Sequence, residues 1–131
     1  MDADGARAGW RPGRGPPRMV HVHKTSLDAL ARTQLELASA APSGRSAHTL
    51  YGGHEQVLRQ TLIALTAGSS LSEHENPGEA TLQVLSGRVR LTAGADSWDG
   101  RTGDLLLIPR RRHALHAVET AVVLLTVAKH G

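Results

Sequence analysis

Residues 68–87 read GSSLSEHENPGEATLQVLSG and place a histidine, two flanking carboxylates and a Pro-Gly turn between two strand-like segments. Residues 103–113, GDLLLIPRRRH, repeat this layout with a glycine, an apolar run, a proline and then a histidine. Polar side chains grouped where strands end are candidates for a binding or catalytic site, because function is commonly carried at such connections. The two stretches therefore predict a β-rich fold with His74 and His113 at its site.

Short apolar runs continue outward from these stretches and have turn-forming Gly, Pro, Asn, Asp and Ser between them. This spacing is typical of an antiparallel β-barrel or sandwich, and closure into a barrel would also protect the sheet edges. We expect an all-β fold, an antiparallel barrel of the jelly-roll kind with one N-terminal helix. The expected strands cover residues 57–65, 80–85, 88–92, 97–98, 104–108 and 121–128.

Four kinds of segment precede the expected barrel. Residues 1–19 are mostly Gly, Pro and Arg with little to bury, which predicts a flexible basic tail. Residues 20–24, VHVHK, alternate like a short strand, whose His21 and His23 could chelate a metal or simply face water. Apolar residues at helical spacing predict a helix from Ser26 to Ala40, and a connector follows at 48–54. The expected domains are the tail at 1–19, a strand, helix and connector at 20–52, and the barrel at 53–131.

The composition narrows the chemistry and the partners. There is no cysteine, so any transition metal must rely on His, Asp or Glu. The formal charge of +3 lies within residues 1–24, so a nucleic-acid partner is not expected, and the run Arg110 to Arg112 is interpreted as a solvated loop. No apolar run approaches the ~20 residues that span a bilayer, and no signal-peptide core is present. We expect no membrane partner and a cytoplasmic location.

The paired stretches resemble the two motifs of the cupin superfamily. In that family the first motif reads G-x5-H-x-H-x3–4-E-x6-G, and the second reads G-x5-P-x-G-x2-H-x3-N. The resemblance implies a jelly-roll barrel in which the motif histidines and glutamate converge on one metal ion. Gly68, His74 and Gly87 match the first motif, and Gly103, Pro109 and His113 match the second.

The resemblance implies that one divalent metal ion is held by His74, Glu79 and His113, with Zn, Mn, Fe and Ni all compatible. This chain departs from the family because Glu79 lies one residue before the glutamate position and Arg111 replaces the internal glycine of the second motif. On a regular strand Glu79 would face away from the lumen, unless a turn or bulge rotates it inward. Without a metal, the two histidines are hydrogen-bonded polar residues in a pocket. The rest of the expected ligand pocket comprises Asn76, Gln83 and His116.

Three functions fit these residues. The first is a binding protein for a small polar ligand, with or without a metal, in sensing or regulation. The second is a metal-dependent cupin enzyme of the dioxygenase or isomerase type, and the third is a non-catalytic interaction module. No residue is assigned a catalytic role, since the serines lack the strand-turn-helix context of a catalytic serine. A homodimer is expected, because two-fold dimers are the commonest oligomers and cupins pair through strands and N-terminal segments.

Overall fold

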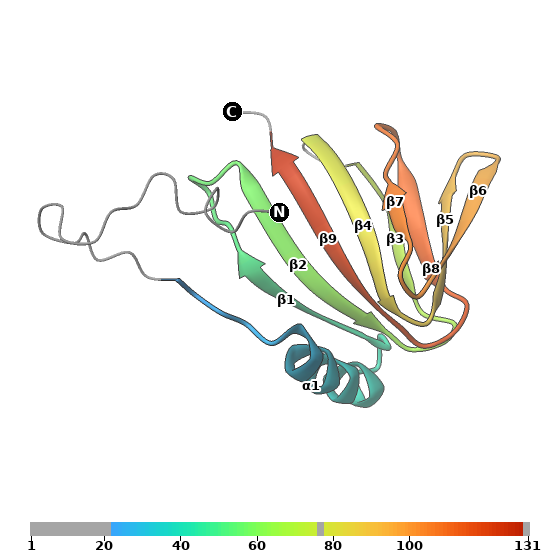
Figure 1. Ribbon diagram of the computed structural model, residues 1–131. Helices are drawn as coiled ribbons and strands as arrows, with labels where there is room; N and C mark the ends of the chain where they lie inside the picture. Colours follow the sequence, from blue (N-terminus) through green and yellow to red (C-terminus); the bar gives the residue numbers. More distant parts are fainter. Residues whose placement is uncertain (1–21, 76–77, 130–131) are drawn as a thin grey trace, which may run out of the picture.

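Two antiparallel sheets face each other, and one helix covers the outer side of the larger sheet (Figure 1). The computed structural model describes residues 22–75 and 78–129. Sheet A has the strand order β1-β2-β9-β4-β7, and sheet B has the order β3-β8-β5-β6. The expected all-β jelly-roll class with one N-terminal helix is confirmed. In chain order the elements are α1 (Leu27–Ala40), β1 (Arg45–Tyr51), β2 (Leu58–Leu65), β3 (Ser70–His74), β4 (Gly78–Ser86), β5 (Arg88–Ala93), β6 (Asp96–Arg101), β7 (Leu105–Leu107), β8 (His113–Ala117) and β9 (Ala121–Lys129).

The core lies between the two sheets. Successive side chains of a strand point to opposite faces, so each strand contributes every second residue to the interior. On β4, for example, Leu82 and Val84 are buried while Gln83 between them is exposed. The inward side chains of both sheets pack into one cluster that is entirely aliphatic. It contains Ile63, Leu65, Leu82, Val84, Val89, Leu91, Leu115, Ala117, Ala121 and Val123.

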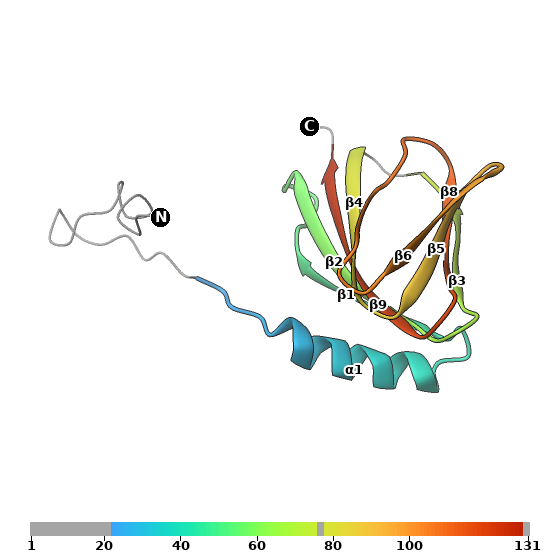
Figure 2. The ribbon, with the colours of Figure 1, turned by 45° about the vertical axis from the view of Figure 1, so that its right-hand side comes forward.

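Helix α1 protects the outer face of sheet A, as its amphipathic pattern predicts. The Ser26 side chain accepts a hydrogen bond from the Ala29 N–H at 3.1 Å and so caps the first turn. The helix runs along the outer side of the sheet beside β1 and β2 (Figure 2). Its apolar face forms a second buried cluster with outward residues of the sheet, among them Leu62 and Val122. The predicted helix from Ser26 to Ala40 is confirmed within one residue.

The structure corrects several of the predicted elements. The strand expected at 20–24 is absent from its described part, residues 22–24, and Val22 is 86% exposed; His21 lies outside the described residues. Most of the expected connector at 48–54 belongs to β1, so sheet A begins ahead of residue 53. Strands β3 and β8 were missed because their sequences, SLSEH and HALHA, are short and polar or small. Pairing within sheet B holds them extended, because β3 pairs with β8 and β8 also pairs with β5, and local propensity does not reveal this.

Candidate functional site

Two histidines from different strands meet at one end of the barrel. His74 ends β3, His113 begins β8, and the two residues are partners in the antiparallel register. The centroids of their rings lie 4.6 Å apart, with the ring planes at 58°. The structure thus brings together the two motif histidines, although 38 other residues separate them along the chain. They form the centre of the candidate site.

The backbone fixes which nitrogen of each ring is free. The Nδ1 atom of His74 lies 2.8 Å from the Ser72 carbonyl oxygen, and that of His113 lies 2.8 Å from the Arg111 carbonyl oxygen. A carbonyl oxygen can only accept, so Nδ1 carries the proton in both rings. In the neutral rings this leaves each Nε2 with a lone pair. Within the described chain neither Nε2 has a hydrogen-bond partner. The pair therefore presents two nitrogen acceptors of fixed tautomer to an incoming group.

The space beneath the two rings is narrow and apolar. Besides the histidines, its walls are aliphatic and come from both sheets, and they include Leu71 and Ile108. The cavity measures about 20 Å³, which is room for about one water molecule. His113 is 2% exposed, whereas His74 is exposed to solvent. The site is therefore shallow: it opens at His74, ends on a packed aliphatic floor, and lacks the ~300 Å³ of a typical ligand chamber.

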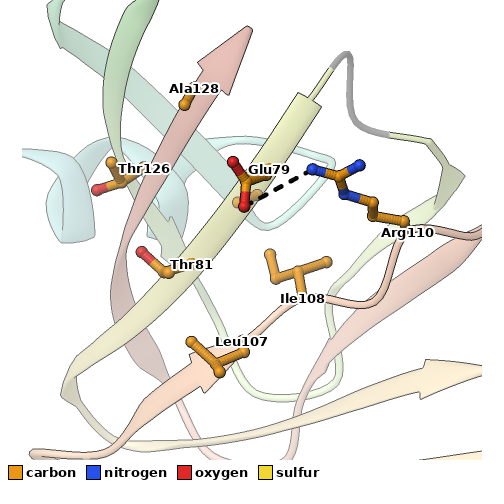
Figure 3. Close-up of a pocket in the computed structure, with 8 residues that line it drawn as sticks. Glu79, Thr81, Leu107, Ile108, Arg110, Thr126 and Ala128 are labelled. Carbon is orange, nitrogen blue, oxygen red and sulfur yellow. Dashed lines mark ion pairs between the residues drawn. The ribbon is translucent and has the colours of Figure 1, made fainter. Parts of the chain in front are cut away.

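Glu79 does not join the two histidines. It lies on the outer face of sheet A, because its neighbour Ala80 takes the inward position on β4. Its carboxylate is 75% exposed and lies 3.6 Å from the Arg110 guanidinium (Figure 3). The strand is regular at this point, so no bulge rotates the carboxylate inward. The metal ligation that the resemblance implies for Glu79 required an inward turn of its carboxylate. The structure instead shows the outward position expected for a regular strand, away from His74 and His113.

The three expected pocket residues are also dispersed. Gln83 shares the outer face of sheet A with Glu79 and is exposed. His116 occupies the outer face of sheet B, where its Nδ1 lies 2.7 Å from the Ser70 hydroxyl and its Nε2 lies 3.5 Å from the Thr92 hydroxyl. Asn76 lies outside the described residues. Among the predicted site residues that the structure describes, His74 and His113 adjoin the lumen. Glu79, Gln83 and His116 do not, because side chains alternate between the two faces of β4 and of β8.

A wider groove lies on the outer face of sheet A, where Figure 3 shows its residues. It measures about 340 Å³ and is shallow, and its charged groups are Glu79 and Arg110, which pair with each other at its edge. Leu107 and Ile108 form the apolar part of its wall. The groove is larger than the lumen, but it has no cluster of unpaired polar groups. We therefore place the candidate site at the two histidines.

The donors present do not complete the metal site that the cupin motifs imply. Bound first-row metals generally have three or more protein nitrogen or oxygen ligands. In residues 22–75 and 78–129, no three His, Asp or Glu side chains gather closely enough to hold an ion. His74 and His113 supply two nitrogens, and Glu79 faces away from them. The described residues therefore do not fit the family's metal, and the site is best understood as a pair of imidazoles.

The strongest charge cluster of the described chain lies away from this site, on the outer face of sheet B. Asp99 accepts hydrogen bonds from Arg90 at 2.8 Å and from Arg88 at 2.6 Å. These hydrogen bonds, Arg90's foremost, together with the positive charge of both guanidiniums hold the pKa of Asp99 well below its ordinary value. The same contacts raise the pKa of Arg90. The cluster ties β5 to β6 and takes no part in the histidine pair.

Sequence reasoning identified the imidazoles but missed what orients and surrounds them. The two tethering groups are main-chain carbonyls, each two residues before its histidine. Main-chain atoms carry no residue-specific signal, so no motif could have named Ser72 or Arg111. Ile108 could have been found, because it directly precedes the proline of the second motif at the end of an apolar run.

Comparison with solved structures identifies the fold. A conserved protein of unknown function from Streptococcus pyogenes is 29% identical, with a TM-score of 0.63, over 70% of this chain and 79% of that one. A cupin superfamily protein from Desulfitobacterium hafniense is 22% identical, also with a TM-score of 0.63, over 72% of this chain and 88% of that one. This chain therefore has the cupin fold, which confirms the resemblance of its paired motifs.

A variant of salicylate 1,2-dioxygenase from Pseudoaminobacter salicylatoxidans is similar as well. It is 19% identical with a TM-score of 0.63, and the match covers 77% of this chain but only 31% of the dioxygenase. At this identity the likeness concerns the fold and not the reaction. No protein-family model and no curated protein matches the sequence. No helix in the described part of the chain is long and apolar enough to cross a membrane.

Proposed function

We propose that this chain is a small-molecule-binding protein of the cupin fold whose ligand engages His74 and His113 at the open end of the barrel. The observation that carries the proposal is the pair of unpartnered Nε2 atoms, held at fixed orientation by the Ser72 and Arg111 carbonyls. Two acceptors side by side above an aliphatic floor favour a small polar group that can donate hydrogen bonds, such as a hydroxyl, an amide or an amine.

The depth of the site sets how the ligand lies. The lumen beneath His113 has room for about one water molecule, at 20 Å³. A polar end group therefore reaches the imidazoles, while the rest of the ligand stays near exposed His74 or displaces the wall. Rigid strands on both sides hold the two rings in place before binding, which reduces the entropy lost on association. Sensing or regulation is the role proposed for such a binding site.

Thermal shift against a panel of small polar metabolites tests the proposal. A ligand that binds only the folded chain stabilises it by RT ln(1 + [L]/Kd), so true ligands raise the melting temperature in a saturable way. His113→Leu should abolish the shift, whereas His116→Ala, on the other face of the same strand, should keep it. Hits that stabilise the His113→Leu variant equally well would contradict the proposal.

A separate metal titration tests the alternative that this chain is a metal-dependent enzyme. Zn²⁺, Mn²⁺, Fe²⁺ and Ni²⁺ are titrated separately into untagged protein, and the His74→Ala, His113→Ala double variant serves as the control. Stoichiometric binding that the double variant loses would support a metal centre completed by donors beyond the described residues. Metal-free protein that still binds a panel ligand would support the simpler binding site.

We further propose a cytoplasmic homodimer. Leu105 and Leu107 are 60% and 75% exposed on the outer face of sheet A, where they alternate about inward Leu106. Exposed apolar side chains on an edge strand favour contact with another chain. Light scattering over a range of concentrations should give the mass of two chains, and Leu107→Lys should shift it towards one. A concentration-independent monomer would reject the dimer.

A further inference from the structure

Three consecutive arginines connect one short segment to three different strands. Residues 108–112 follow β7 and lead into β8, and Arg110 to Arg112 are the charged part of this segment. Each arginine forms an ion pair with an acid on another element. Arg110 lies 3.6 Å from Glu79 of β4, Arg111 lies 2.6 Å from Asp96 of β6, and Arg112 lies 3.5 Å from Glu73 of β3. A run that looks like a solvated loop in the sequence is thus fully paired.

The segment passes from one sheet to the other at the end where the two histidines meet. It leaves the edge strand of sheet A and enters sheet B at His113 (Figure 2). Ile108 lines the narrow lumen, and its N–H donates to the Ala80 carbonyl oxygen at 3.0 Å. The Arg111 carbonyl oxygen accepts the hydrogen bond that orients His113. The segment therefore forms part of the wall and also sets the direction of the buried imidazole.

The ion pairs that hold this segment are exposed. The six charged side chains retain between 49% and 75% of their accessible surface. Exposed ion pairs of this kind are individually weak, and dissolved salt screens them. Apart from Ile108, no residue of the segment contributes to the lumen wall. Besides the hydrogen bond and the packing of Ile108, the segment is attached by ion pairs that ionic strength can loosen. The cavity beneath it is too small for a whole ligand while the segment stays in place.

We propose that residues 108–112 form a lid over the histidine pair, which the three ion pairs hold shut and which opens as ionic strength rises. The lid rests on the proposed ligand site and regulates it, because opening moves Ile108 away from the lumen and exposes His113. The acids that hold it belong to both sheets, since Glu79 lies in sheet A and Glu73 and Asp96 lie in sheet B. Loosening the arginines therefore frees the segment from both sheets at this end.

Chemical labelling of His113 measures opening without a ligand. Diethyl pyrocarbonate acylates accessible imidazoles, and peptide mapping by mass spectrometry gives the rate at each histidine. In low salt, His113 should react slowly compared with exposed His48. Raising NaCl from 20 mM to 1 M should increase the ratio of the His113 labelling rate to the His48 labelling rate about tenfold. This is the combined effect of three exposed pairs that each shift the equilibrium about two- to threefold.

Substitution separates the lid from general salt effects. The triple variant Arg110→Gln, Arg111→Gln, Arg112→Gln should label His113 at the high-salt rate already in low salt, and added NaCl should change it little. Arg90→Gln is the matched control, because it breaks an exposed ion pair between Arg90 of β5 and Asp99 of β6, which involves no residue of the lid. This control should label like the unaltered protein at every salt concentration.

The proposal is overturned if His113 of the unaltered protein labels independently of salt, or if the triple variant labels at the low-salt rate. Circular dichroism checks that the triple variant is folded. If it is not, the exchange Glu73→Arg with Arg112→Glu tests the same point, since the swapped pair should restore slow labelling that Arg112→Glu alone loses. A salt-independent His113 beside positive ligand binding would reject the lid and leave the proposed function intact.

Discussion

Replacing His113 with leucine should leave the fold as stable as before or slightly more stable, although it removes a residue of the proposed site. His113 is 2% exposed and lies among aliphatic side chains of both sheets. A side chain kept for packing alone would be apolar in these surroundings. On the proposed function, a polar residue stands there because it binds the ligand, at some expense of stability.

The magnitude follows from the contacts. The His113→Leu variant loses the hydrogen bond to the Arg111 carbonyl, worth about 1 kcal/mol, and leaves that oxygen to find water. It gains about 1–2 kcal/mol because an aliphatic side chain of similar size fills a dry, apolar position. The free energy of unfolding should therefore change by less than about 1 kcal/mol, with a small gain as the central value. Such a change moves the melting temperature of a domain of this size by about 4 °C at most.

Urea denaturation followed by circular dichroism measures the change at fixed protein concentration, since dimerisation would otherwise shift the midpoint. Leu91→Ala is the comparison, because Leu91 is 2% exposed in the same core and its truncation should cost about 3–5 kcal/mol. A loss of more than about 2 kcal/mol in His113→Leu would refute the reasoning. It would show that the His113 imidazole stabilises the fold at this end of the barrel, and that stability alone explains a histidine there.

Two further outcomes follow from the turns and charges. Gly87 has φ +87°, and a Cβ there would lie 2.1 Å from the Thr120 carbonyl oxygen, so Gly87→Ala should lower the free energy of unfolding by at least about 2 kcal/mol. Gly94 has φ +60° but open space around it, so Gly94→Ala should lower it by about 1 kcal/mol. The same urea experiment measures both. The pKa of Asp99 is held below its ordinary value of 3.8, foremost by the hydrogen bond from Arg90, so its stabilising contribution is complete above that pH and is lost as the pH falls below it. Melting temperatures between pH 5 and pH 2 should accordingly fall less steeply for Asp99→Asn than for the unaltered protein, and the difference should be small because the pair is exposed; parallel curves would contradict the assignment.

The proposed lid changes how the histidine pair is understood. With residues 108–112 in place, the site is an imidazole pair over a filled lumen, and on the proposed function only the polar end of a ligand reaches the two rings. With the segment displaced, Ile108 leaves the wall and His113 becomes reachable. The same three arginines would then link affinity to ionic strength, although none of them lines the lumen.

The amino-acid sequence by itself determined the fold class, the helix and the two histidines. The alternating apolar residues of β4, the continuous apolar run of β9 and the helical spacing from Ser26 to Ala40 are local patterns, and each is typical of its element. The two histidines stand at the motif positions, so their resemblance to cupins could predict that they meet. Even Glu79 follows this rule, because strand parity alone places it on the outer face, and only the resemblance to the cupin motif suggested otherwise.

The tertiary structure decided what depends on partners distant in sequence. Strands β3 and β8 are too short, and too polar or small, for local sequence to predict them. Pairing in the sheet holds them extended, since β3 pairs with β8 and β8 also pairs with β5. The size of the lumen depends on how aliphatic side chains from both sheets interpenetrate, which no single segment encodes. The run of three arginines forms ion pairs with acids on three other strands. The sequence of the run does not reveal these partners, because an arginine without a nearby acid is simply solvated.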